Sequence, residues 1–147
     1  MKKNTIQLAT IIIILFFFCG CGKYHRDRYI GTWDFVTERV FSEYDEKENV
    51  VIELNRDTIY YVGTISLGNS EGYLLIEYSE NEDVLVWLDE DGYMYTHLGS
   101  IFGYSSGLFD SNKKMHLTLR WSEFTDLGFY DTKRCHISGT KKKGGKK

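Results

Sequence analysis

The sequence has no proline, and it has only three cysteines and four histidines among its 147 residues. A structural zinc site needs four clustered Cys or His ligands, whereas His25, His97, His116 and His136 lie far apart along the chain. A phosphate-binding glycine loop and a nucleophile elbow are also missing. We therefore expect no enzyme activity, no catalytic residues, no metal site and no cofactor.

Positive charge is scarce over most of the chain. Residues 24–140 carry 21 acidic and 10 basic side chains, and residues 57–112 contain no lysine or arginine. A surface of this sign repels a phosphate backbone, so we expect no nucleic-acid partner. Basic charge returns in residues 141–147, which hold five lysines. We expect a flexible solvated tail there; contact with anionic headgroups or an acidic partner is the alternative.

The N-terminus has the layout of an export signal. Lys2 and Lys3 precede a run from Ala9 to Cys19 that is apolar except for Thr10, which is typical of a signal peptide. As a helix this run reaches only about 16 Å, roughly half of the hydrocarbon core of a bilayer. The segment is thus too short to serve well as a transmembrane anchor.

The end of this segment reads Phe17-Phe18-Cys19-Gly20-Cys21-Gly22 and resembles the lipobox of bacterial lipoproteins. Phe18 and Cys19 depart from the usual residues of that pattern, while Gly20 supplies the small residue before the cut. The resemblance implies that residues 1–20 are a cleaved signal peptide and that Cys21 is acylated, as by palmitate, at the head of a tether over 21–28. A multiply acylated cysteine would hold the protein in the bilayer.

Location follows from the same resemblance. The chain resembles lipoproteins of Gram-negative gut anaerobes in its short signal and its Tyr-, Gly- and Asp-rich body. In those lipoproteins, export to the cell surface goes with an acidic cluster just after the lipidated cysteine. Residues 22–28 are instead mostly basic. We expect a lipid-anchored protein of the cell outer membrane that faces the periplasm.

Cleavage and acylation would leave Cys135 without a cysteine partner. We expect this side chain to be buried as a small hydrophobe. His136 follows it directly, but adjacent side chains of a strand point to opposite faces. The two cannot act together as nucleophile and base.

The body of the chain alternates apolar and polar residues with a period of two, which predicts an all-β domain over 29–140. The predicted inward faces are Met115, Leu117, Leu119 and Trp121; Ile59, Tyr61, Gly63, Ile65 and Leu67; and Leu74, Ile76 and Tyr78. The continuous apolar run 84–88 predicts a strand covered on both sides, and Asp91-Gly92 predicts a tight hairpin. Residues 99–107 are expected to form a flexible loop.

About eight strands with short links predict an antiparallel meander that closes into a small barrel, because closure removes exposed sheet edges. A two-layer sandwich is the alternative. Acidic clusters at 80–83 and 89–92 lack calcium-loop spacing, and Asp and Gly are common in hairpin turns. We interpret both clusters as turns, and a calcium site in one of these oxygen-rich turns is the alternative.

Gly31-Thr32-Trp33 at the first strand resembles the Gly-x-Trp start of lipocalins and related small barrels. The resemblance implies that Trp33 closes the bottom of the barrel and packs against an arginine of a late strand, Arg134 or Arg120. The alternative is that Trp33 is an ordinary core aromatic at the start of a strand.

Tyrosine is abundant, with 11 residues. Tyrosine combines an apolar face with a polar tip, so a set of these side chains could line a ligand mouth or fill the barrel. The candidates are Tyr60, Tyr73, Tyr93, Tyr95 and Tyr104. We expect a non-catalytic module that binds a small apolar or glycan-like ligand; the alternative is an accessory subunit that binds an envelope protein.

Overall fold

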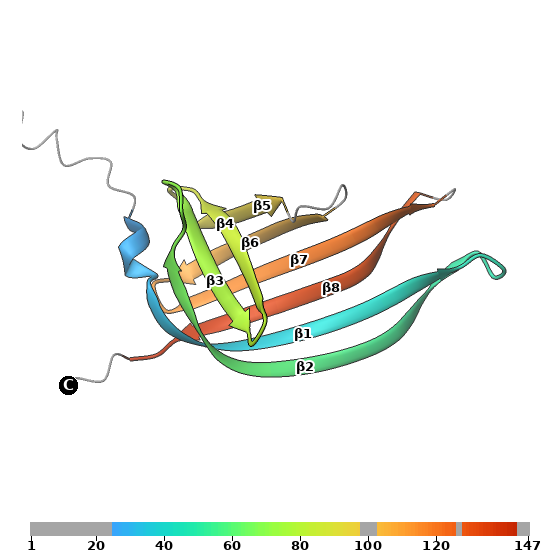
Figure 1. Cartoon of the computed structure of the whole chain (residues 1–147), viewed down its shortest axis with the longest axis horizontal. Helices are drawn as coiled ribbons and strands as arrows, with labels where there is room; N and C mark the ends of the chain where they lie inside the picture. The colour runs from blue at the N-terminus through green and yellow to red at the C-terminus, as the bar shows by residue number, and fades with distance from the viewer. Residues whose placement is uncertain (1–24, 98–102, 126–127, 144–147) are drawn as a thin grey trace, which may run out of the picture.

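The computed structural model describes residues 25–97, 103–125 and 128–143. A short 3-10 helix, η1 (His25–Arg28), precedes eight strands (Figure 1). The strands are β1 (Gly31–Asp45), β2 (Val50–Leu67), β3 (Tyr73–Ser79), β4 (Glu82–Leu88), β5 (Tyr93–His97), β6 (Gly103–Ser111), β7 (Lys114–Thr125) and β8 (Gly128–Lys141).

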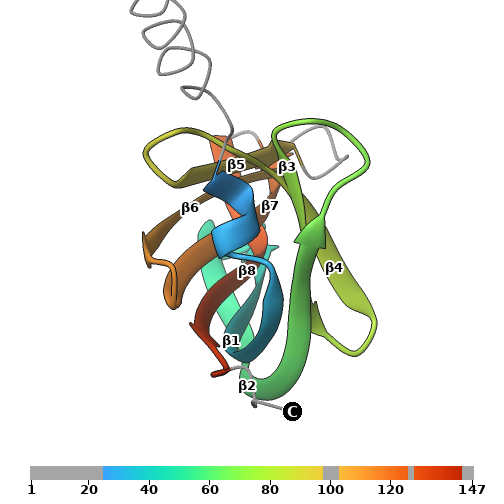
Figure 2. The ribbon, with the colours of Figure 1, turned by 90° about the vertical axis from the view of Figure 1, so that its left-hand side faces the viewer.

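The eight strands form a closed antiparallel barrel in simple meander order. Each strand pairs with the next, and β1 also pairs with β8, from Trp33 opposite Lys141 to Phe41 opposite Lys133. The view along the barrel in Figure 2 shows the ring formed by these strands. The predicted all-β barrel is confirmed, and the sandwich alternative is wrong because the β1–β8 ladder closes the sheet on itself.

Strand length divides the barrel into a compact wall and two extensions. Strands β3 to β6 have five to nine residues, whereas β1, β2, β7 and β8 have 12 to 18. Beyond the β1–β8 ladder, the β1–β2 and β7–β8 hairpins continue as separate ribbons (Figure 1). Register shifts occur at this point, at Phe41/Ser42 and at Trp121/Ser122, and such bulges bend strands.

Period-two alternation fills the barrel with apolar side chains. The buried residues are Tyr29, Trp33, Phe35, Ile65, Leu74, Ile76, Tyr78, Val84, Val86, Leu88, Met94, Phe109, Met115, Leu117, Leu119, Cys135 and Ile137. The predicted inward faces of 74–78 and 115–119 are therefore confirmed. The predicted face of 59–67 is confirmed at Gly63 and Ile65 but is wrong at Leu67, which is 50% exposed. Packing is close enough that a Cβ at Gly139 would lie 2.8 Å from Met115 and 2.9 Å from Phe35.

Trp33 lies at the end of the barrel next to η1. Its indole Nε1 donates a 2.9 Å hydrogen bond to the carbonyl of Tyr29, and its ring packs against Phe35 and Phe109. Tyr29 in turn stacks on Phe109 with 3.8 Å between ring centroids. Together, these aromatics close this end of the barrel.

The expected stacking of Arg134 or Arg120 on Trp33 is wrong. Trp33 points inward, whereas Arg134 lies on the outer face of β8 and donates to Asp131 at 2.7 Å. The guanidinium of Arg120 lies over the ring of Tyr104, 5.4 Å from its centroid. Trp33 is thus a core aromatic, because both arginines fall on the outward positions of their strands.

Two other expectations are also corrected. The strand at 84–88 is not covered on both sides, because Leu85 and Trp87 point outward and are each 39% exposed. Residues 103–107 belong to β6 rather than to a loop. Residues 99–102, the signal segment 1–20 and Cys21 lie outside the described residues. Within the part that is described, no helix is long and apolar enough to span a bilayer.

Candidate functional site

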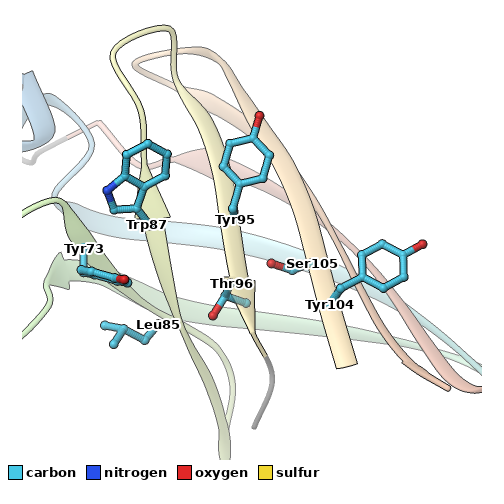
Figure 3. A pocket seen from close by; sticks show the side chains of 7 residues that line it. All are labelled: Tyr73, Leu85, Trp87, Tyr95, Thr96, Tyr104 and Ser105. Atoms are coloured by element: carbon cyan, nitrogen blue, oxygen red, sulfur yellow. The ribbon is translucent and has the colours of Figure 1, made fainter. Parts of the chain in front are cut away.

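An aromatic groove runs across the outer wall of the barrel over β3 to β6 (Figure 3). Its volume is about 570 Å³. The side chains that line it are Tyr73, Leu85, Trp87, Tyr95, Thr96, Tyr104 and Ser105. We refer to this feature as the aromatic groove.

The groove arises where two strands of the wall separate. Strands β4 and β5 are paired only at Trp87 with Tyr95 and at Leu88 with Met94. Beyond Trp87 toward the start of β4, the strands have no described ladder between them. Thr96 and Ser105, which belong to the inward set of β5 and β6, therefore reach the floor of a groove whose sides are outward-facing residues.

Two aromatic rings stand side by side over this opening. Trp87 on β4 and Tyr95 on β5 are a cross-strand pair with 6.1 Å between ring centroids and an interplanar angle of 34° (Figure 3). Gly72, in the turn between β2 and β3, supports the indole closely: a Cβ there would lie 3.0 Å from Nε1 of Trp87. The turn thus packs closely against one ring of the groove.

Tyr104 is the third exposed aromatic of the groove. It pairs with Arg120 across the β6–β7 ladder, and the Arg120 guanidinium covers one side of its ring. Contact between a guanidinium and an aromatic face restricts the ring. About half of the surface of Tyr104 remains exposed beside this contact.

The chemistry of the groove is apolar with hydroxyl groups. Among its lining residues, none carries a charge. Ser105 is 5% exposed, and its hydroxyl has no hydrogen-bond partner among the residues described. Buried polar groups normally have partners, so an unpaired hydroxyl beneath a groove calls for an explanation. The arrangement offers ring faces for stacking and hydroxyls for hydrogen bonding.

Three of the five tyrosines expected at a ligand site come together here: Tyr73, Tyr95 and Tyr104. Tyr60 lies on β2 and is 78% exposed, and Tyr93 is exposed on β5 without lining the groove. The groove lies on the outer wall, not at the mouth of the barrel. Sequence reasoning missed Trp87 and Leu85, since a continuous apolar run does not reveal which residues face outward.

A cluster of four charged side chains closes the far mouth of the barrel, on the inner face. Arg39 donates to Asp57 at 2.8 and 2.5 Å; this hydrogen-bonded contact raises the pKa of Arg39 and lowers the pKa of Asp57. Lys133 donates to Glu82 at 2.7 Å, and Arg39 lies 3.8 Å from Glu82. The cluster is internally neutralised, so it joins strands instead of leaving a charge for a ligand.

A second hollow, of about 520 Å³, lies on the outer face of β1, β2 and β8. It mixes acidic and basic side chains, but several are already paired with each other. Arg56 contacts Glu53 at 3.0 Å, and Arg134 contacts Asp131 at 2.7 Å. These pairs leave this hollow a weaker candidate than the aromatic groove.

One histidine does contact a carboxylate. Nε2 of His116 lies 3.1 Å from Asp110, and its Nδ1 lies 3.1 Å from the hydroxyl of Ser138. The three residues form a row on the outside of β6, β7 and β8, and His116 is 62% exposed there. A row of cross-strand contacts on an open sheet surface does not exclude water or position a substrate, as catalytic groups require.

Cys135 and His136 point to opposite sides of β8, as predicted. Cys135 is fully buried, and burial raises the pKa of its thiol to about 11. His136 is exposed, and its Nδ1 lies 3.1 Å from the hydroxyl of Thr118. Cys135 therefore packs as a small hydrophobe.

The described residues contain no group of three or more His, Cys, Asp or Glu side chains that could hold a metal ion. Asp89 instead organises the β4–β5 turn, since its Oδ1 accepts hydrogen bonds from the amides of Asp91 and Tyr93. This is the usual role of aspartate at a turn.

No protein-family model, curated protein or solved structure matches this chain. The functional argument therefore depends on the geometry of the aromatic groove.

Proposed function

We propose that this chain is a lipid-anchored lipoprotein of the bacterial envelope whose barrel binds a neutral, glycan-like ligand in the aromatic groove. It acts without catalysis. The observation that carries the proposal is the pair of exposed rings, Trp87 and Tyr95, above an uncharged groove with an unpaired Ser105 hydroxyl at its floor.

A sugar ring matches this surface in two respects. Its C–H faces pack against aromatic rings, and its hydroxyls take hydrogen bonds from polar tips such as those of tyrosine and serine. A ligand with phosphate or carboxylate groups would find no cation among the lining residues. These features favour a neutral saccharide.

Binding is tested by calorimetry against a panel of neutral glucose-, mannose-, galactose- and N-acetylglucosamine-based oligosaccharides. Trp87→Ala removes one wall of the groove, and we expect it to weaken binding at least tenfold, equal to about 1.4 kcal/mol. Tyr60→Ala is the matched control, because Tyr60 is an exposed aromatic of β2 outside the groove. Equal losses in both variants would contradict the proposal.

The anchor is a separate part of the proposal. It is supported by the basic and apolar layout of residues 1–20 and by the Gly20-Cys21 junction. Metabolic labelling with palmitate in a bacterial host tests it directly. We expect Cys21→Ala to abolish the label and Cys19→Ala to retain it; labelling that survives Cys21→Ala would refute acylation at this position.

A second candidate is an envelope accessory subunit that binds another protein. The observation in its favour is the exposure of four apolar residues near the start of β2: Val50, Val51, Ile52 and Leu54. Exposed apolar patches often mark protein interfaces. Replacing Val51 and Leu54 with Ser would then abolish partner capture and leave glycan binding unchanged.

A further inference from the structure

We propose that the end of the barrel next to η1 lies against an anionic phospholipid surface through a basic face. This face consists of Arg28, Lys113, Lys114, Lys141, Lys142 and Lys143. The inference rests on the proposed acylation at Cys21, because that anchor would bring this end of the barrel to the bilayer.

Three separate segments bring the basic face together. η1 leads into β1, the β6–β7 turn holds Lys113, and β8 ends at Lys141. The amide of Lys141 donates to the carbonyl of Lys113 at 2.9 Å, and its Nζ donates to the carbonyl of Arg28 at 2.8 Å. Figure 2 views this end, with η1 and the end of β8 on the same side of the molecule.

The side chains of this face are accessible. Arg28, Lys113, Lys114, Lys142 and Lys143 are exposed, and Lys141 is half-buried. Lys142 pairs with Asp34 at 3.1 Å, which offsets one charge. The sequence adds Lys146 and Lys147 beyond the described residues, and Cys21 precedes η1 by only four positions. The described part of the chain therefore begins and ends at the basic face.

Charge differs around and along the barrel. Asp89, Glu90 and Asp91 are on the β4–β5 turn at the same end, where the amide of Phe109 donates to the carbonyl of Gly92 at 3.0 Å. Asp27 and Asp34 are also exposed next to the basic face. The basic residues gather on the side of that end formed by η1, the β6–β7 turn and the end of β8. The opposite tip, between β1 and β2, contains Asp45, Glu46 and Glu48 around Lys47. An anionic surface would attract the first side and repel the far tip.

The electrostatic attraction between the basic face and an anionic bilayer is large enough to affect binding. A lysine or arginine near an anionic bilayer contributes about fivefold to partitioning, which salt weakens within a Debye length. A multiply acylated Cys21 would already hold the protein in the bilayer, so the basic face would keep the barrel close against the lipid surface instead of serving as the anchor. It would also orient the barrel with its long hairpins pointing away from the bilayer (Figure 1).

The experiment uses a chain of residues 22–147, from which the signal and Cys21 are absent. It retains the fold because the closed ring and its core lie between Tyr29 and Lys141. Sedimentation is measured with vesicles of phosphatidylcholine containing about one third phosphatidylglycerol and with phosphatidylcholine alone. We expect binding only to the anionic vesicles, and its loss at high salt.

Two double variants make the test specific. Lys113→Gln with Lys114→Gln should lower anionic vesicle binding about twenty-fivefold. Lys47→Gln with Arg56→Gln removes the same amount of charge at the far end of the barrel. This control variant should change anionic vesicle binding less than about twofold. Circular dichroism checks that both variants keep the β-barrel.

Three outcomes would each overturn the basic-face inference. The chain could fail to bind anionic vesicles, it could bind neutral vesicles equally well, or the two double variants could have equal effects. The palmitate experiment reports on Cys21 independently of these results. Labelling at Cys21 without vesicle binding by the unlipidated chain would therefore refute this inference while leaving the anchor in place.

Discussion

Lys133 on β8 and Glu82 on β4 form an ion pair of 2.7 Å across the inside of the barrel, although their strands are not neighbours in the ring. Both side chains are about three-quarters buried. The Lys133 ammonium also lies 4.8 Å from the centroid of the Trp121 ring. This contact joins the β3–β4 hairpin to the opposite wall, at the end of β4 that has no described ladder with β5.

We expect Lys133→Met to lower the free energy of unfolding by about 1–2 kcal/mol, because it leaves the largely buried Glu82 carboxylate without its lysine. Urea denaturation measures this change. The control is Arg56→Met, which breaks the exposed Glu53–Arg56 pair and should lower the free energy of unfolding less than Lys133→Met does. Equal costs would show that the cross-barrel pair has no special role.

Alkaline pH should destabilise the barrel. Burial raises the pKa of Cys135 to about 11 from its ordinary value of 9.0, and burial also raises the pKa of Tyr78. The unfolded chain thus loses these protons at a lower pH than the folded barrel does. Stability is retained below pH 9.0 and falls as the pH rises toward about 11.

The pH dependence of the urea midpoint tests this expectation. Cys135→Ala removes the buried thiol, so its midpoint should fall less steeply over the same pH range. A slope identical to that of the parent protein would show that Cys135 does not contribute to the alkaline loss.

Gly72→Ala should both destabilise the barrel and disturb the aromatic groove. Gly72 has φ of +88°, which is unfavourable for alanine, and the new Cβ would meet Trp87 at 3.0 Å. We expect a loss of about 1–2 kcal/mol from the backbone alone, together with a change in tryptophan fluorescence.

Gly128→Ala separates these two effects. Gly128 has φ of +115°, but among the described residues other than its chain neighbours no atom lies within 4 Å of the added Cβ. It should carry the backbone cost without altering the fluorescence of Trp87 or ligand binding. If both alanine variants change the groove equally, the close contact between Gly72 and Trp87 is not what positions the indole.

The order of the strands could be predicted from sequence because period-two alternation and turn residues are local signals. The inward faces at 74–78 and 115–119 followed directly from that alternation. The orientation of 84–88 did not, because Val84 and Leu85 are both apolar although one is buried and the other faces the groove. Where apolar residues fall on both faces, only the tertiary fold decides which face is covered.

The site was less predictable than the fold. The groove depends on the separation of β4 from β5 beyond Trp87, which is a property of ladder length and not of any local motif. Tyrosine abundance pointed to Tyr73, Tyr95 and Tyr104, but it gave no reason to exclude Tyr60. The pairing of Arg134 with Asp131, three residues away, similarly overrode the expected contact with Trp33.

The row of Asp110, His116 and Ser138 provides a test of the expectation that the protein is not an enzyme. His116→Ala should change stability by less than about 0.5 kcal/mol, since the side chain is mostly exposed. It should also leave the background hydrolysis of p-nitrophenyl acetate unchanged. Loss of a measurable esterase activity in this variant would restore the enzyme hypothesis.

The central claim is that ligand binds on the outer wall of the barrel. The most direct measurement is NMR chemical-shift mapping with the tightest-binding neutral oligosaccharide from the panel. We predict that the largest shifts fall on the Trp87 indole and on the amides of Tyr95 and Ser105, with little change at Met115 or Ile137 inside the barrel. Shifts centred on the interior residues, or spread over the β1–β2 hairpin, would contradict the account.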